Sequence, residues 1–103
     1  MPQLTFLSNP DVTFHEANPI VRNLSSEYNG ENANQARSGG AYRVISIYAD
    51  HAYGNKNDEP VEQAIRDLLG DMRHLCDRFD IDFDELLERS ERTYRDELVN
   101  PIG

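Results

Sequence analysis

A run of apolar residues after Pro60 is the strongest constraint that this sequence places on its fold. These residues recur at intervals of three and four, the spacing of one face of an α-helix: Val61, Ala64, Ile65, Leu68, Leu69, Met72, Leu75, Cys76 and Phe79. Proline is tolerated in the first turn of a helix, because its missing N–H would have no partner there. The spacing therefore predicts an amphipathic helix over residues 60–78.

A second amphipathic helix is expected after a short turn. Asp82 can cap its start, and Glu85 stands three residues later as the capping-box partner. Its apolar face is expected to hold Phe83, Leu86, Leu87, Ser90, Tyr94 and Leu98, and the pattern ends before Pro101. Because a short connection makes two helices antiparallel neighbours, we expect one shared seam, made of Leu68, Leu69, Met72, Phe83, Leu86 and Leu87.

The stretch over residues 31–53 has two interpretations. Small and apolar residues recur there at helical spacing, which favours a helix. Against this, the Gly39-Gly40 pair costs about 2 kcal/mol of helix propensity relative to alanine, and residues 42–49 are rich in β-branched and aromatic side chains. We predict a helix, because a helix accounts for more of the apolar positions than a strand does.

The N-terminal part carries weaker patterns. Apolar and polar residues alternate on both sides of a Ser-Asn-Pro-Asp turn within residues 3–16, which predicts a β-hairpin. Residues 17–32 are expected to be an irregular connection. The fold class is thus mainly α: one domain over residues 1–103, with a hairpin and irregular segment over 1–30 and a small helical bundle over 31–103 that ends in an antiparallel helical hairpin.

Charge is distributed unevenly along the chain. Residues 1–57 hold five acids and four bases, whereas residues 58–103 hold fourteen acids and six arginines, and the net charge is −9. Such a surface repels phosphate groups, so we expect no direct nucleic-acid binding. It suits a protein partner with a basic surface, a cation, or solubility alone.

The cellular setting follows from what the chain lacks. Cys76 is the single cysteine, which excludes an internal disulfide and fits a reducing cytoplasm. We find no signal-peptide pattern at the start and no stretch of eighteen apolar residues. The sequence therefore predicts a cytoplasmic protein without a membrane span.

Two groups of residues are candidates for a site. Asp67, Asp71 and His74 recur along one stripe of the 60–78 helix and could ligate a divalent metal, although a solvated face with ion pairs to Arg66, Arg73 and Arg78 is the more common explanation of such a stripe. The second group combines tyrosine and arginine, which interfaces favour, with acids: Tyr42, Arg43, Ile47, Tyr48, Tyr53, Asp77, Asp80 and Asp84. Its alternative is partial burial of the tyrosines under the N-terminal segment. We identify no catalytic residue and no cofactor apart from that metal.

Two resemblances accompany these residues. The segments Asp67–Asp77 and Asp82–Ser90 resemble the C-terminal part of small phage and prophage proteins without a settled activity, which implies a mobile element acting in a bacterial host cell. Gly70-Asp71 before an apolar run is faintly similar to MazG-type nucleotide pyrophosphohydrolases, which hold magnesium with paired acids on neighbouring helices. Residues 31–53 contain no such pair, and Leu68 stands where the second motif has Glu.

Three functional hypotheses result. The leading one is a small acidic phage-type protein that binds a host protein, and by charge mimicry inhibits a nucleic-acid-binding defence complex in the manner of anti-CRISPR proteins. The second is a metal-dependent phosphohydrolase-like or degenerate MazG-like protein. The third is a homo-oligomeric accessory protein, a homodimer being its simplest form.

Overall fold

Four α-helices make up most of the computed structural model, which describes residues 11–102. They are α1 (Phe14–Arg22), α2 (Ala33–Tyr53), α3 (Val61–Arg78) and α4 (Phe83–Val99), and a 3-10 turn, η1 (Gly30–Asn32), leads into α2. No strand occurs among the described residues, where Thr13 and Pro60 form one isolated bridge. The mainly α prediction is confirmed, as are the three helices predicted within residues 31–98.

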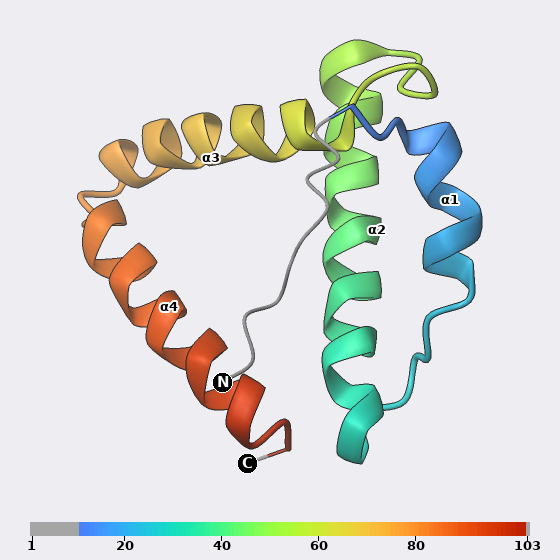
Figure 1. Cartoon of the computed structure of the whole chain (residues 1–103). Helices are drawn as coiled ribbons and strands as arrows, with labels where there is room; N and C mark the ends of the chain where they lie inside the picture. Colours follow the sequence, from blue (N-terminus) through green and yellow to red (C-terminus); the bar gives the residue numbers. More distant parts are fainter. Residues whose placement is uncertain (1–10, 103) are drawn as a thin grey trace.

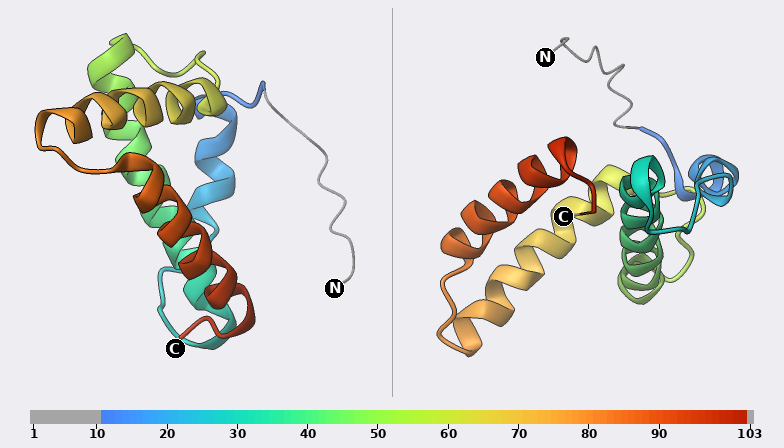
Figure 2. Two further views of the ribbon diagram at one scale, coloured as in Figure 1. Left: turned by 90° about the vertical axis from the view of Figure 1, so that its left-hand side faces the viewer. Right: turned by 90° about the horizontal axis from the view of Figure 1, so that it is seen from below.

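The helices form a three-sided frame with α1 attached to one side (Figure 1). The long α2 is the central side, α1 lies along it, and α3 leaves the C-terminal end of α2 at a steep angle. The chain turns at residues 79–82, and α4 runs back toward the N-terminal end of α2. Seen from below, α3 and α4 lie on the side of α2 opposite α1 (Figure 2).

The core is built around α2 and consists mostly of alanine. Phe14 and Ala49 are completely buried, and Ala64 of α3 packs with them and with Ile45. The small side chains allow α1 and α3 to approach α2 closely, and Phe14 fills the remaining volume. We call this region the α2 core; its buried residues are Phe14, Ala17, Ala33, Ala36, Ile45, Ala49 and Ala64.

The N-terminal hairpin prediction is wrong in the part that the structure describes. Its first arm and turn tip, residues 3–10, lie outside the described residues, but its second arm is the start of α1. Thr13 and Glu16 form a capping box: the Glu16 N–H donates to Thr13 Oγ1 at 3.2 Å, and the Thr13 N–H donates to Glu16 Oε1 at 3.1 Å. This box satisfies two otherwise unpaired backbone groups and starts a helix where alternation alone indicates a strand.

The prediction that residues 17–32 are irregular is also wrong for their first six residues. The α1 helix continues through Pro19 to Arg22, and its buried residues Phe14 and Ala17 pack toward α2. Tertiary burial of this face outweighs the proline, which removes one backbone hydrogen bond from the helix. Only residues 23–29 form the irregular connection before η1.

The helical hairpin of α3 and α4 has the predicted elements but an open seam. Asp82 caps α4 by accepting from the Glu85 N–H at 3.1 Å, and Phe83 is buried next to the turn. Beyond the turn the two helices diverge (Figure 1), so four of the six predicted seam residues remain more than 40% exposed: Leu69, Met72, Leu86 and Leu87. We call residues 69–99 the α3–α4 arm.

The free end of the arm returns to α2 through polar contacts. Asn34 Nδ2 donates to the Glu97 carbonyl oxygen at 2.9 Å, and Arg37 Nε lies 2.6 Å from Glu97 Oε2. These contacts close the third corner of the frame. The corner therefore depends on one acidic residue rather than on apolar packing.

Candidate functional site

The tyrosines of α2 and the acids of α3 form one structural unit. The Tyr48 hydroxyl donates to Asp71 Oδ2 at 2.6 Å, and the Tyr53 hydroxyl donates to Asp67 Oδ2 at 2.5 Å. Both tyrosines are half-buried and pack against the α2 core. We call these two pairs the tyrosine–aspartate clasp, because they join α2 to α3 at two successive turns of α3.

The clasp changes the acidity of its phenols. The hydrogen bond to Asp71 raises the pKa of Tyr48 to about 12, with burial as a further cause. Burial raises the pKa of Tyr53, and its hydrogen bond to Asp67 acts in the same direction. Both hydroxyls are therefore protonated at neutral pH and are available as donors to the carboxylates.

The clasp also accounts for two of the three candidate metal ligands. Asp67 and Asp71 each accept from a tyrosine, and Asp67 Oδ1 additionally lies 3.4 Å from Arg66 Nε. His74 is exposed. Within residues 11–102, no group of three or more His, Cys, Asp and Glu side chains is arranged to hold a metal ion. The geometry thus gives the stripe a structural role and does not bring its three members together as ligands.

The remaining members of the tyrosine group are divided between two surfaces. The Tyr42 hydroxyl donates to the Phe14 carbonyl oxygen at 3.1 Å and to Asn18, so it faces α1. Arg43 and Ile47 are exposed on α2. Of the three tyrosines, only Tyr42 thus bonds to the described N-terminal segment, whereas Tyr48 and Tyr53 bond to α3.

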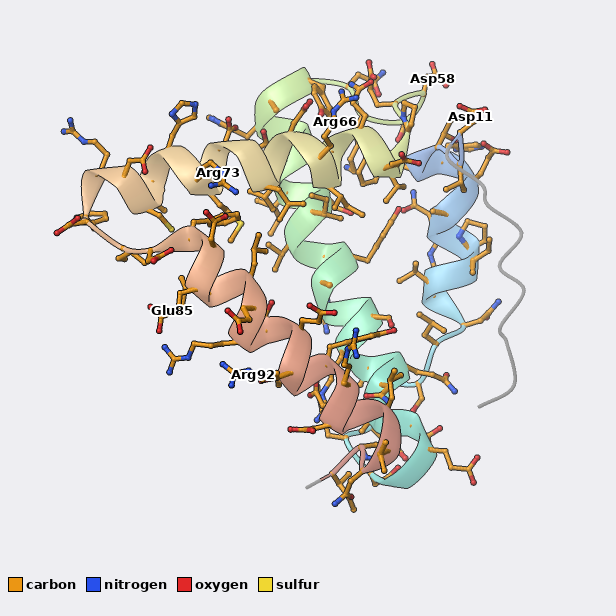
Figure 3. All side chains as sticks on the ribbon, turned by 60° about the vertical axis from the view of Figure 1, so that its left-hand side comes forward. Asp11, Asp58, Arg66, Arg73, Glu85 and Arg92 are labelled. Carbon is orange, nitrogen blue, oxygen red and sulfur yellow. The ribbon has the colours of Figure 1, made fainter. Side chains whose placement is uncertain are left out.

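The acidic candidates gather at the turn between α3 and α4, the outer corner of the frame (Figure 1). Asp77 and Asp80 have no ion pair with a basic side chain among residues 11–102. Asp84 lies 3.0 Å from Arg73 Nη2, and the same guanidinium stacks over the Phe83 ring at 4.6 Å from its centroid. Figure 3 shows Arg73 reaching from α3 toward the start of α4. Asp84 is therefore paired with Arg73 at this turn, whereas Asp77 and Asp80 are exposed to solvent.

Backbone geometry singles out Asp80. Its φ angle is +55°, the left-handed conformation in which glycine is the usual residue. The Asp80 N–H donates to the Asp77 carbonyl oxygen at 3.4 Å, and the Ile81 N–H donates to the Cys76 carbonyl oxygen at 2.9 Å. These two bonds make a Schellman motif that ends α3. An aspartate here carries a conformational cost that glycine would avoid.

Two large apolar side chains flank this aspartate. Phe79 is 69% exposed and Ile81 is 45% exposed. Sequence reasoning placed Phe79 on the buried stripe of α3 and missed it as a surface residue. Met72 and Leu75 of the same stripe are exposed as well, so the exposure follows from the open seam between α3 and α4, and no local pattern could have located it. We call Asp77, Phe79, Asp80 and Ile81 the acidic corner.

Comparison with known proteins gives no relative for this chain. No family model, no curated protein and no solved structure matches it. Among the described residues, no helix combines the length and the apolar character that crossing a membrane would need.

Proposed function

We propose that the chain is a non-enzymatic protein-binding module of phage type that modulates or inhibits a host protein by docking its acidic corner on a basic surface. The single observation that supports this most is the acidic corner itself, where exposed Phe79 and Ile81 are bordered by solvent-facing Asp77 and Asp80. An apolar anchor can supply binding energy, and unpaired acids around it can steer a basic partner.

The conformation of Asp80 supports the same proposal. Backbone strain in folded proteins is concentrated at functional positions. The Schellman motif would be more stable with glycine at position 80. A charged side chain at this position has a reason to be there if its carboxylate contacts a binding partner.

The charge of the surroundings defines the partner. Residues 58–103 carry a balance of −8, from fourteen acids and six arginines. A host surface that normally binds nucleic acid has the complementary charge and is the class of partner that the proposal names, inside a bacterial cytoplasm. Long-range steering of this kind is strongest at low salt.

Competitive capture tests this function. The immobilised chain should retain basic proteins from a bacterial lysate at about 50 mM salt, lose most of them at about 500 mM salt, and release them to excess duplex DNA. Phe79→Ser should weaken retention at both salt concentrations, because it removes the anchor. Asp80→Asn should weaken it at low salt only, because asparagine tolerates the left-handed conformation but carries no charge.

A matched control distinguishes charge at the corner from charge elsewhere. Glu62 is an exposed acid of α3 far along the helix from the corner, so Glu62→Gln changes the net charge by the same amount as Asp80→Asn. Equal losses from both variants would mean that net charge alone drives retention. Retention that salt, DNA and Phe79→Ser all leave unchanged would refute the proposal.

The metal hypothesis has a separate test. If Asp67 and Asp71 bind Mg²⁺ or Mn²⁺, the metal must share their carboxylates with the tyrosine hydroxyls, and millimolar metal should raise the melting temperature because it binds the folded state alone. Asp71→Asn should abolish that rise. Since each carboxylate already accepts from a tyrosine and the described residues offer no group of three ligands, we expect no such shift.

A further inference from the structure

The α3–α4 arm exposes the kind of residue that folded proteins normally bury. Leu69, Met72, Leu86 and Leu87 are between 41% and 44% exposed, and Tyr94 and Leu98 continue the exposed row along α4. The α2 core, in contrast, buries mainly alanine. Contiguous apolar patches on monomers rarely exceed a few hundred Å², and larger ones mark interaction sites.

The opposite side of α4 is polar, which defines the apolar row as one face. Glu85 and Arg92 point away from α2 in Figure 3. Leu87 follows Glu85 by two positions and Tyr94 follows Arg92 by two, which is about 200° around the helix, so both lie on the opposite side. Leu87 and Tyr94 share one face, since residues seven apart return to the same side of a helix. The row is therefore a continuous stripe and not a scatter of single exposed side chains.

We infer that this apolar stripe of the α3–α4 arm, centred on Met72, Leu86 and Leu87, is the interface through which two copies of the chain form a symmetric dimer. A dimer joins two identical patches about a two-fold axis, so a uniformly apolar stripe is complementary to itself. Two copies would pair α3 and α4 with their counterparts, which completes a four-helix layer of the common kind. The seam that the monomer leaves open would then be closed by the same side chains of the second copy.

The exposed area is large enough for such an interface. The chain exposes 8197 Å², whereas a compact protein of 11.8 kDa exposes about 5,900 Å². If the residues outside the described range, about 1.2 kDa, are credited with the surface of an unfolded chain, about 1,700 Å², then about 6,500 Å² belongs to the remaining chain of about 10.6 kDa. A compact protein of that mass exposes about 5,500 Å², so an excess of about 1,000 Å² remains. A stable protein–protein interface needs about 800 Å² from each partner.

Charge pairing on the arm favours a second copy over a basic partner at this surface. Three acids of α4 lie within 4 Å of an arginine of the arm: Asp84 with Arg73, Glu85 with Arg89 and Glu91 with Arg95. Glu97 is paired with Arg37 of α2. Four of the six acids of α4 are thus paired with an arginine within the chain, whereas Asp77 and Asp80 of the acidic corner are not. A basic protein is therefore attracted less strongly to this surface than to the acidic corner.

The dimer goes beyond the proposed function and uses a different surface. The acidic corner lies at the outer end of the arm, where α3 and α4 meet (Figure 1), so each dimer would carry two corners. The two proposals respond to salt in opposite directions. Each copy carries a net charge of −9, so screening should strengthen the dimer, whereas it should weaken capture of a basic partner.

The test is the molar mass of the purified full chain in solution, measured by light scattering and sedimentation over about 1–100 μM, a range in which specific dimers dissociate. We expect twice the chain mass of 11.8 kDa at the upper end, and a lower dissociation constant at high salt. Leu87→Glu should raise the dissociation constant at least about thirty-fold, the effect of losing a central anchor. Met72→Glu on α3 should act in the same way.

Controls separate loss of the dimer from loss of the fold. Far-ultraviolet circular dichroism should show full helicity in both variants, because neither side chain belongs to the α2 core. Ile47→Glu, on an exposed apolar residue of α2 outside the stripe, should leave the mass unchanged, and so should Asp80→Asn. A monomer at every concentration and salt, or a dimer that Leu87→Glu and Met72→Glu leave intact, would overturn the inference.

Discussion

The α2 core and the α3–α4 arm are both helical, yet they use side-chain size in opposite ways. The α2 core buries alanines, Ile45 and one aromatic residue, Phe14, so its helices lie close together and their polar groups reach across, as in the tyrosine–aspartate clasp. The arm buries only Cys76 and Phe83 and leaves its leucines exposed. Forming helices and forming a buried core are therefore separate requirements. Both regions form helices, but only the α2 core buries its apolar side chains within one chain.

The largest expected effect is on Phe14, because the α2 core depends on it for volume. Phe14 has no exposed surface, and its truncation to alanine should lower the free energy of unfolding by about 3–5 kcal/mol. Leu86→Ala in the arm should cost under about 1 kcal/mol in the monomer, since nearly half of that side chain is already exposed. Urea unfolding at concentrations where the chain is monomeric measures both. Equal losses would break the comparison between the regions.

Sequence reasoning predicted the elements of both regions better than their packing. The three helices within residues 31–98 follow from periodicity and from the Asp82 cap, both of which are local. The α1 helix was missed because the alternation within residues 3–16 was interpreted as a hairpin and the capping box of Thr13 and Glu16 was not considered. The open seam could not be foreseen, since an apolar stripe looks the same whether the neighbouring helix or a second molecule covers it.

The candidate sites show the same division between local and tertiary information. Tyr48 and Asp71 were assigned to different hypothetical sites, a partner surface and a metal stripe, although they bond to each other. Their separation of 23 residues hides this pairing from any local pattern. The acids Asp77 and Asp80 were named from charge alone, and the exposure of Phe79 between them depends on the tertiary divergence of α3 and α4.

The clasp offers the next two tests, one at neutral pH and one at alkaline pH. At neutral pH, Tyr53→Phe should lower the free energy of unfolding by about 1 kcal/mol, the typical value of one hydrogen bond. For Tyr48, the folded-state pKa of about 12 lies above the ordinary value of 10.0. The stabilisation from this hydroxyl is therefore complete below pH 10 and is lost as the pH rises toward 12.

Melting temperatures measured between pH 8 and pH 12 test the sign of this effect. The fall in melting temperature across the alkaline range should be shallower in Tyr48→Phe than in the original chain. Tyr28→Phe is the matched control, because Tyr28 is exposed, lies outside both the clasp and the apolar stripe, and its hydroxyl makes no hydrogen bond with the described residues. A Tyr48→Phe profile that runs parallel to the original one would show that the clasp contributes nothing to stability.

A smaller effect of opposite sign is expected at the acidic corner. Asp80→Gly removes the cost of a left-handed φ angle from a non-glycine residue and should raise the free energy of unfolding by about 1 kcal/mol. Asp80→Asn should change it much less, since asparagine keeps a side chain in the same conformation. Denaturant midpoints compare the two. A less stable Asp80→Gly variant would mean that the carboxylate itself holds the corner together, which would weaken the case for an outward-facing role.

The smallest effect uses two helical glycines as a matched pair, one in each region. A Cβ atom added at Gly39 of α2 or at Gly70 of α3 would meet nothing within 4 Å, apart from its own helix. Each change to alanine should therefore add about 0.5–1 kcal/mol from helix propensity alone. If the molecule unfolds as one unit, both variants shift the global transition equally. If the monomeric arm opens before the α2 core, Gly70→Ala should slow hydrogen exchange only in amides of the arm, whereas Gly39→Ala should slow exchange in the α2 core. If the separate slowing of exchange in the arm and in the α2 core is seen in dilute protein but lost at concentrations where dimers form, then the second copy of the chain stabilises the arm.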